Sequence, residues 1–130
     1  MNNDLLAPAQ AIMDWCDAIF TDAAETLAEK QTTDLQRIRR CAGAFVALVE
    51  EQAEAIARLR AGEISRPLLH ELRNPLNCMI GYSDMILSGF DGDLPDGMIG
   101  YVQQIFEAAH RVNNTLDGFV AAAQDDSSTG

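Results

Sequence analysis

The sequence predicts an all-α protein that folds as one domain. Its 130 residues are enough for a single core, and 48% of them are apolar while only 6% are aromatic. The apolar residues recur at spacings of three and four, which is the period of amphipathic helices. Strand signals are missing, because no alternating run rich in β-branched residues is bounded by turns. These observations favour a helical architecture throughout.

Two amphipathic segments fill the first half of the chain. The apolar stripe of the first consists of Leu5, Ile12, Trp15, Ile19, Ala23 and Leu27. The stripe of the second consists of Leu35, Ile38, Ala42, Phe45, Val49, Ile56 and Leu59. We expect one helix along each stripe, and the second helix should end where residues 61–63 supply a break.

Two further segments fill the second half. A third helix is expected to begin near Ser65 as its N-cap, with Pro67 tolerated in the first turn, and to stop near Ser88. Its stripe consists of Leu69, Leu72, Leu76, Met79 and Ile86. The fourth segment has a heptad seam made of Met98, Val102, Ile105, Ala109, Val112, Leu116, Phe119 and Ala123. Residues 89–95 are rich in turn formers and Pro95 is well placed to begin the last helix, so these two segments form a hairpin.

An internal repeat relates the two halves. A shift of 67 positions, which carries Pro8 onto Pro75 (75 − 8), also aligns the flanking apolar residues without a gap. The aligned pairs include Leu5 with Leu72, Ile12 with Met79, Ile19 with Ile86, Ile38 with Ile105, Ala42 with Ala109 and Val49 with Leu116. We therefore expect one hairpin over residues 1–61, a second over residues 62–124, and a disordered tail over residues 125–130. Two hairpins packed side by side would give an antiparallel four-helix bundle with a shared core.

Charge and cysteine content restrict the partners and the compartment. Asp and Glu outnumber Lys and Arg by 20 to 9, and the net charge of −11 repels nucleic-acid phosphates and anionic membrane headgroups alike. Cys16, Cys41 and Cys78 are odd in number and widely spaced, so we expect reduced thiols with neither a disulfide framework nor a zinc site. A basic start and an apolar run of roughly 18 residues are both missing. The sequence predicts a cytoplasmic protein without a membrane anchor, a metal or a cofactor.

The run from His70 to Asn77, HELRNPLN, combines a titratable nucleophile, an adjacent carboxylate and a helix-distorting proline. An imidazole is largely neutral and nucleophilic near neutral pH, and the carboxylate of Glu71 can accept or orient its other proton. His70 lies one step off the apolar stripe, so it should project from the flank of the bundle. Asn74 lies one turn further on the same face, and Pro75 removes a backbone hydrogen bond beside the nucleophile. The run indicates phosphoryl chemistry on the histidine.

The first hairpin has no such motif. The 67-residue shift places Asn3 opposite His70, Asp4 opposite Glu71, and Ala7 opposite Asn74. The first copy thus keeps the apolar scaffold and lacks the nucleophile. We expect one hairpin to carry the chemistry and the other to be structural. The chain would then form by itself the four-helix bundle that a dimer of two hairpins would form.

With the Gly-Tyr-Ser sequence that follows it and the glycine-rich turn, this motif resembles the dimerisation and histidine-phosphoacceptor domain (DHp or HisKA) of bacterial two-component sensor histidine kinases. The resemblance covers residues 62–123 well and residues 3–60 as a degenerate echo. It implies that His70 accepts a phosphoryl group and exchanges it with an aspartate of a response-regulator receiver domain. It also implies that Glu71 polarises the imidazole as a general base, and that Asn74 orients water for dephosphorylating the receiver.

Three functions fit this resemblance. A self-sufficient kinase is not expected, because the family's ATP-binding domain would have to follow the last helix and no Gly-rich phosphate cradle is present. The leading expectation is a phosphotransfer module whose partner is a receiver domain or a separate histidine kinase, with Arg73 and Asn77 facing that partner. The alternatives are a non-catalytic scaffold or inhibitor that binds through the same bundle, and a receiver phosphatase that depends on Asn74. A bundle within one chain predicts a monomer, whereas pairing of second hairpins predicts a homodimer.

Overall fold

The computed structural model describes residues 2–90, 92–95 and 97–129, with side chains in the last helix described as far as residue 124. Every regular element in these ranges is a helix, in agreement with the predicted all-α class. The elements are α1 (Asn3–Ala23), α2 (Glu29–Glu51), α3 (Ala53–Arg60), α4 (Arg66–Leu87) and α5 (Ile99–Thr129). The described part of the chain thus contains five helices, one more than the four predicted.

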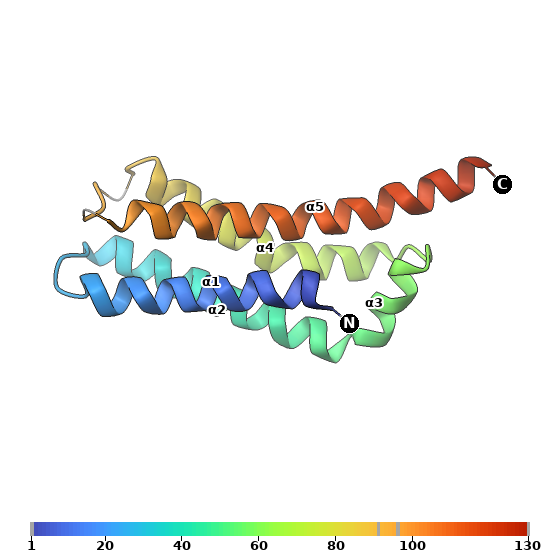
Figure 1. Cartoon of the computed structure of the whole chain (residues 1–130), viewed down its shortest axis with the longest axis horizontal. Coiled ribbons are helices and arrows are strands. Elements are labelled where there is room, and N and C mark those ends of the chain that lie inside the picture. The colour runs from blue at the N-terminus through green and yellow to red at the C-terminus, as the bar shows by residue number, and fades with distance from the viewer. Residues whose placement is uncertain (1, 91, 96, 130) are drawn as a thin grey trace.

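The long helices α1, α2, α4 and α5 lie side by side along the length of the molecule (Figure 1). α1 packs against α2 and α5, and α4 packs against the same two helices. Chain direction alternates, because α1 and α4 run one way in Figure 1 while α2 and α5 run the other. The arrangement is compatible with the antiparallel bundle that the sequence predicts. It also places the second hairpin, α4 and α5, directly against the first.

The second predicted helix is interrupted. The apolar stripe predicts one helix through Leu59, whereas α2 ends before Gln52 and α3 begins after it. Gln52 has φ −103° and ψ 23°, outside the helical region, although neither glycine nor proline marks the position. α3 then turns towards the beginning of α4 (Figure 1) and buries Ile56 and Leu59. The bend therefore occurs without a local breaker and leaves both of these apolar side chains in the core.

The predicted boundaries of α4 are confirmed. The Oγ atom of Ser65 accepts a hydrogen bond from the backbone N–H of Leu68 (3.3 Å), which satisfies one donor of the first turn. Pro67 sits in that turn, where its missing N–H costs nothing. The helix stops just before Gly89, whose φ of 80° is the left-handed conformation typical of a helix C-terminus. The local sequence therefore determines both ends of the helix that carries the motif.

The last helix begins later than predicted. Gly97 has a φ of 86°, and an α-helix cannot continue through this left-handed conformation. α5 therefore begins at Ile99 and not at Pro95. The helix extends to Thr129, and because the side chains beyond residue 124 lie outside the described part, the tail predicted over residues 125–130 stays a prediction.

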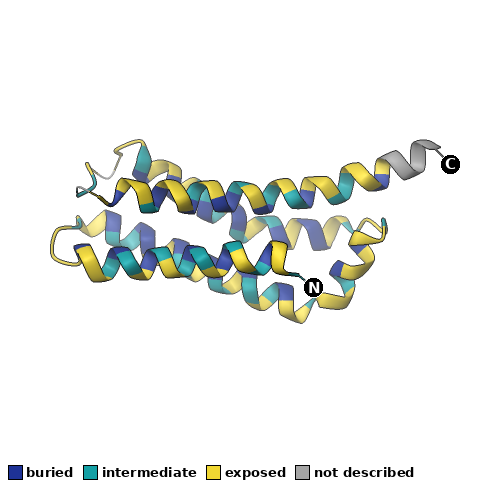
Figure 2. Ribbon diagram, viewed as in Figure 1, coloured by how far each residue is buried: buried dark blue, intermediate teal, exposed yellow. Residues whose placement is uncertain are grey.

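Buried residues recur every three or four positions along the long helices (Figure 2), and these positions repeat with the 67-residue shift. In α1 and α4 the buried pairs are Leu5 with Leu72, Ala9 with Leu76, Ile12 with Met79, Cys16 with Ser83, and Ile19 with Ile86. In α2 and α5 they are Leu35 with Val102, Ile38 with Ile105, Ala42 with Ala109, Phe45 with Val112, and Val49 with Leu116. Pro8 and Pro75 both lie inside their helices. The sequence repeat is thus also a repeat of the core.

None of the described helices is both long and apolar enough to span a membrane.

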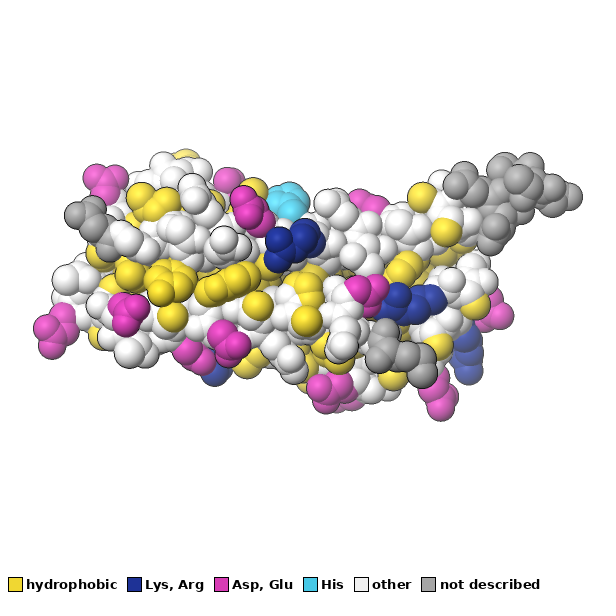
Figure 3. Space-filling view, in the orientation of Figure 1, with side chains coloured by type: hydrophobic (Ala, Val, Ile, Leu, Met, Phe, Trp, Pro, Cys, Tyr) yellow, Lys and Arg dark blue, Asp and Glu magenta, His cyan; other side chains and the backbone are white. Residues whose placement is uncertain are grey.

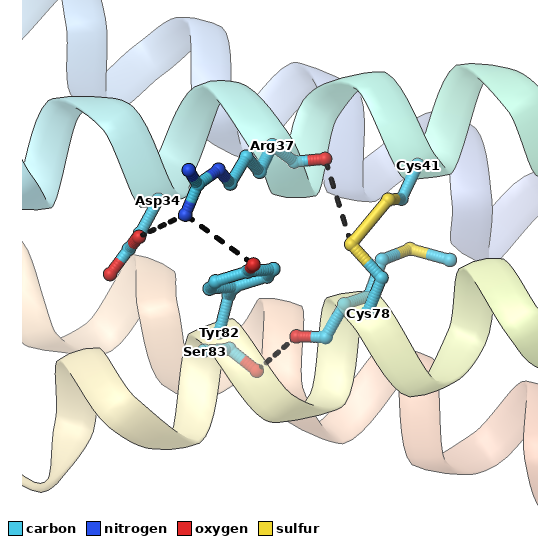
Figure 4. The surroundings of a disulfide bond; sticks show 7 residues. Asp34, Arg37, Cys41, Cys78, Tyr82 and Ser83 are labelled. Atoms are coloured by element: carbon cyan, nitrogen blue, oxygen red, sulfur yellow. Dashed lines mark hydrogen bonds and ion pairs between the residues drawn. A yellow bond between two sulfur atoms is a disulfide. The ribbon is translucent and has the colours of Figure 1, made fainter.

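A disulfide links the two hairpins, contrary to the expectation of reduced thiols. Cys41 of α2 is bonded to Cys78 of α4, with the two Cα atoms 6.5 Å apart (Figure 4). Cys16 is free and buried. The sequence could not show the pairing, because the partners are 37 residues apart on separate helices and meet only when the hairpins pack.

Candidate functional site

His70 lies in the first part of α4 and is exposed, as predicted. Leu69 and Leu72 on either side of it are buried in the core, so the inner face of the helix is fixed and the imidazole is turned outwards. Glu71 is exposed beside it, and no described residue forms an ion pair or a hydrogen bond with its carboxylate. The imidazole of His70 and the adjacent carboxylate are therefore both exposed to solvent.

Asn74 is one helical turn beyond His70 and is also exposed. Residues four apart are neighbours on a helix surface, so the amide and the imidazole share a face. Pro75 follows inside the helix, partly buried, and has no N–H to donate to the carbonyl of Glu71. The predicted catalytic residues thus lie together on one outward face of α4, beside a missing backbone hydrogen bond.

Arg73 points across to α5, where its guanidinium donates to the Oδ1 atom of Asp117 (2.7 Å). The side chain of Arg73 keeps 33% of its exposure, and Asn77, one turn beyond, is exposed. A partner-facing role for both remains a prediction, with the guanidinium already bound to a carboxylate. Sequence reasoning missed Asp117, which lies 44 residues from Arg73, and only the register of the α4–α5 hairpin could have revealed it.

On the matching face of α1, the side chain of Arg60 binds the acidic residue. The guanidinium of Arg60 donates two hydrogen bonds to the carboxylate of Asp4 (2.6 and 2.9 Å) and also contacts the side-chain oxygen of Asn2. It lies 4.7 Å from the ring centre of Phe119. Asp4 is the counterpart of Glu71 under the 67-residue shift. The carboxylate of Glu71 is exposed, whereas that of Asp4 is bound by Arg60. The two flanks share a scaffold and differ in chemistry.

This ion pair should make stability depend on acid pH. The Arg60 guanidinium that donates to Asp4 holds the pKa of that carboxyl below its ordinary value of 3.8. A depressed pKa adds stability above pH 3.8, and this stability is lost as the pH falls through the folded-state pKa. We expect Asp4→Asn to lower the free energy of unfolding at pH 7 by up to about 1 kcal/mol after solvent screening, and by nothing near pH 2. Urea denaturation at both pH values tests this, with Asp22→Asn at the exposed end of α1 as the control.

Two shallow hollows are related by the 67-residue shift. Apolar side chains gather along the boundary of α1 and α5 (Figure 3). The hollow there is lined by Trp15, Gly97, Gly100, Tyr101 and Gln104. The matching hollow between α2 and α4 is lined by Glu29, Lys30, Thr33, Asp34, Arg37, Tyr82 and Met85. His70, Glu71 and Asn74 line neither hollow, so the candidate site is an open helix face, which suits a protein partner better than a small ligand.

Among the described residues, no three histidine, cysteine or acidic side chains are grouped so that they could hold a metal ion. A comparison of the chain with family models, curated proteins and solved structures finds no match. The expected resemblance to the phosphoacceptor domain of histidine kinases therefore depends on the residues of the sequence motif alone.

Proposed function

We propose that this protein is a histidine phosphotransfer module of two-component signalling, which carries phosphate on His70 and exchanges it with the aspartate of a receiver domain. The observation that carries the proposal is the exposed group of His70, Glu71 and Asn74 on one face of α4. Transfer between proteins requires such exposure, because the receiver must bring its aspartyl phosphate to the imidazole. The module would act in the cytoplasm with a receiver or a separate histidine kinase as its partner.

The duplicated core supports a pseudo-dimeric bundle as the scaffold for this function. Buried positions recur 67 residues apart through both pairs of long helices, and each helix of one hairpin packs against the other hairpin. A single hairpin would leave its seam in water, whereas two hairpins cover each other. We propose that α1, α2, α4 and α5 form an antiparallel four-helix bundle within one chain, which predicts a monomer in solution.

The chemistry needs one nucleophile and one proton acceptor. A neutral imidazole nitrogen of His70 attacks the phosphorus of the receiver's aspartyl phosphate. A P–N bond forms while the P–O bond breaks, and the aspartate leaves as a carboxylate. The second ring nitrogen becomes more acidic as the phosphoryl group is acquired, and Glu71 can orient or accept its proton. The reverse sequence returns phosphate to a receiver, so the same residues serve both directions.

A phosphate-exchange assay tests the proposal. The purified protein is mixed with a panel of phosphorylated receiver domains, and intact mass is followed over time with and without an acid treatment. We expect acid-labile phosphate on the wild type and none on His70→Gln. His110→Gln is the matched control, because the other histidine of the chain is half-buried with its ring packed against Phe106 (4.5 Å between centroids). Phosphate on His70→Gln, or none on the wild type with any receiver, would contradict phosphotransfer.

The same assay separates the two alternatives. A scaffold or inhibitor would bind the receiver equally well with histidine or glutamine at position 70, and no phosphate would appear on either form. A receiver phosphatase would empty the receiver without retaining phosphate, and Asn74→Ala would abolish that loss while His70→Gln need not. Each alternative thus has its own pattern of binding, phosphate retention and phosphate loss.

A further inference from the structure

Besides the candidate site, the structure holds a covalent link at only one of two equivalent helix interfaces. Cys41 and Cys78 join α2 to α4. Their counterparts under the 67-residue shift are Ala108 in α5 and Ala11 in α1, two helices that also pack against each other. That second interface has no disulfide, although its core positions are buried in the same register. The fold can therefore pack this type of interface without a covalent bond.

The two cysteines of the link are partly exposed to solvent. Cys41 and Cys78 are each half-buried, whereas Cys16 is fully buried. Burial raises the pKa of the Cys16 thiol to about 12, which leaves it without reactive thiolate. Thiol–disulfide exchange requires a thiolate to approach one sulfur of the bond, and the partial exposure of the link allows this approach. Of the three cysteines, two are therefore partly exposed and the third is unreactive.

The surroundings of the link also suit the reduced state. The Sγ atom of Cys78 lies 3.9 Å from the backbone carbonyl oxygen of Arg37 (Figure 4). A thiol at this position could donate to that oxygen, which a disulfide sulfur cannot do. The Arg37 side chain itself points away towards Asp34 and Tyr82. Reduction would thus leave a polar hydrogen on Cys78 with an acceptor already in place.

We propose that Cys41 and Cys78 form a reversible thiol–disulfide modification site that fastens α4 to the first hairpin when oxidised and releases it when reduced. A low-molecular-weight thiol such as glutathione attacks one sulfur, the S–S bond breaks, and the other cysteine leaves as a thiolate that takes up a proton. A second thiol resolves the mixed disulfide and releases glutathione disulfide, so two electrons and two protons reach the protein. The reverse reaction, with glutathione disulfide as oxidant, restores the link.

The location of the link determines what its release changes. Cys78 lies three residues beyond Pro75, where α4 lacks a backbone hydrogen bond. Before the proline, Arg73 ties the helix to Asp117 of α5, and after the proline the disulfide ties it to α2. Reduction removes the second tie and leaves the first. The segment after Pro75 should then move more freely, while the matching segment of α1, which is never cross-linked, should not change.

The first test counts free thiols in glutathione buffers of varied redox ratio, after quenching and alkylation under denaturing conditions. Mass spectrometry should show one alkylated cysteine in oxidising buffer and three in reducing buffer, with a reversible midpoint between them. The link should lie between Cys41 and Cys78 in peptide maps. Three labels at every ratio would overturn the proposal, because no disulfide would form. One label at every ratio after long incubation would also overturn it, because the bond would not exchange.

The second test measures backbone hydrogen exchange in oxidised and reduced protein. Amides of α4 after Pro75 should exchange at least several-fold faster on reduction, and those of α1 should not change. The double variant Cys41→Ala/Cys78→Ala, which copies the residues of the uncross-linked interface, should match the reduced protein in either buffer. Cys16→Ser, which copies its counterpart Ser83, should respond as the wild type does. Equal exchange of α4 in both states would overturn the fastening role, whatever the thiol count.

Discussion

Truncation of Leu72 to alanine should lower the free energy of unfolding by about 3 kcal/mol, and truncation of Leu5 should lower it by a similar amount. Both side chains are fully buried, and they occupy matching positions in α4 and α1. Removing three carbons from a close-packed core loses the transfer free energy of those atoms and leaves a cavity that the surroundings fill only in part. If the two halves of the core are equivalent, the two costs should agree.

Urea denaturation followed by far-UV circular dichroism measures both costs on one scale. Met85→Ala serves as the control, because this residue is already 39% exposed and its truncation should change the midpoint little. A Leu5→Ala variant as stable as the wild type, beside a strongly destabilised Leu72→Ala variant, would show that the first hairpin is only loosely attached to the core. The two halves would then be similar in sequence but would contribute unequally to the free energy of unfolding.

Replacement of Glu71 by glutamine should slow phosphate exchange at His70 by about 100-fold or more and leave the fold intact. The side chain is exposed, with no bond to a described neighbour that would be lost. Glutamine keeps the size and one oxygen of the side chain, but it cannot accept a proton from the imidazole. The expected loss is therefore mainly in kcat, the rate of exchange at saturating receiver concentration. KM for the receiver should change less.

Rapid-quench measurement of phosphate on the protein tests this expectation. Asp84→Asn removes an exposed negative charge from the same helix and is the matched control for net charge. If both variants slow phosphate exchange by the same small factor, the loss of a negative charge acts only through general electrostatic interaction with the receiver. If Glu71→Gln exchanges phosphate at the rate of the wild type, the carboxylate takes no part in proton handling.

The helices and their inner faces could be predicted because amphipathic periodicity is a property of the sequence itself. Leu5, Leu35, Leu72 and Val102 are buried where their spacing places them, and the 67-residue shift relates their burial as well as their positions in the sequence. The bend at Gln52 could not be predicted, because no glycine or proline marks it and the burial of the short α3 depends on how all the helices pack.

The exposed residues of the candidate site could be predicted for the same reason, since His70 stands one position off a buried stripe. The residues that contact their neighbours could not be predicted. The contact of Arg73 with Asp117 depends on the register between α4 and α5, and the bond of Cys41 to Cys78 depends on how the two hairpins meet. Local pattern predicts which side chains face outwards, and only the packed helices determine which of these side chains meet.

The joining of both hairpins in one chain removes a constraint that every symmetric homodimer obeys. In a homodimer each substitution enters both copies at once, so one flank cannot lose a nucleophile while the other keeps it. Here the two flanks differ, with the Arg60 contact to Asp4 on one side and the exposed His70 on the other. The two flanks of the molecule are therefore unequal, and under the proposed phosphotransfer each encounter with a receiver would transmit one phosphate rather than two.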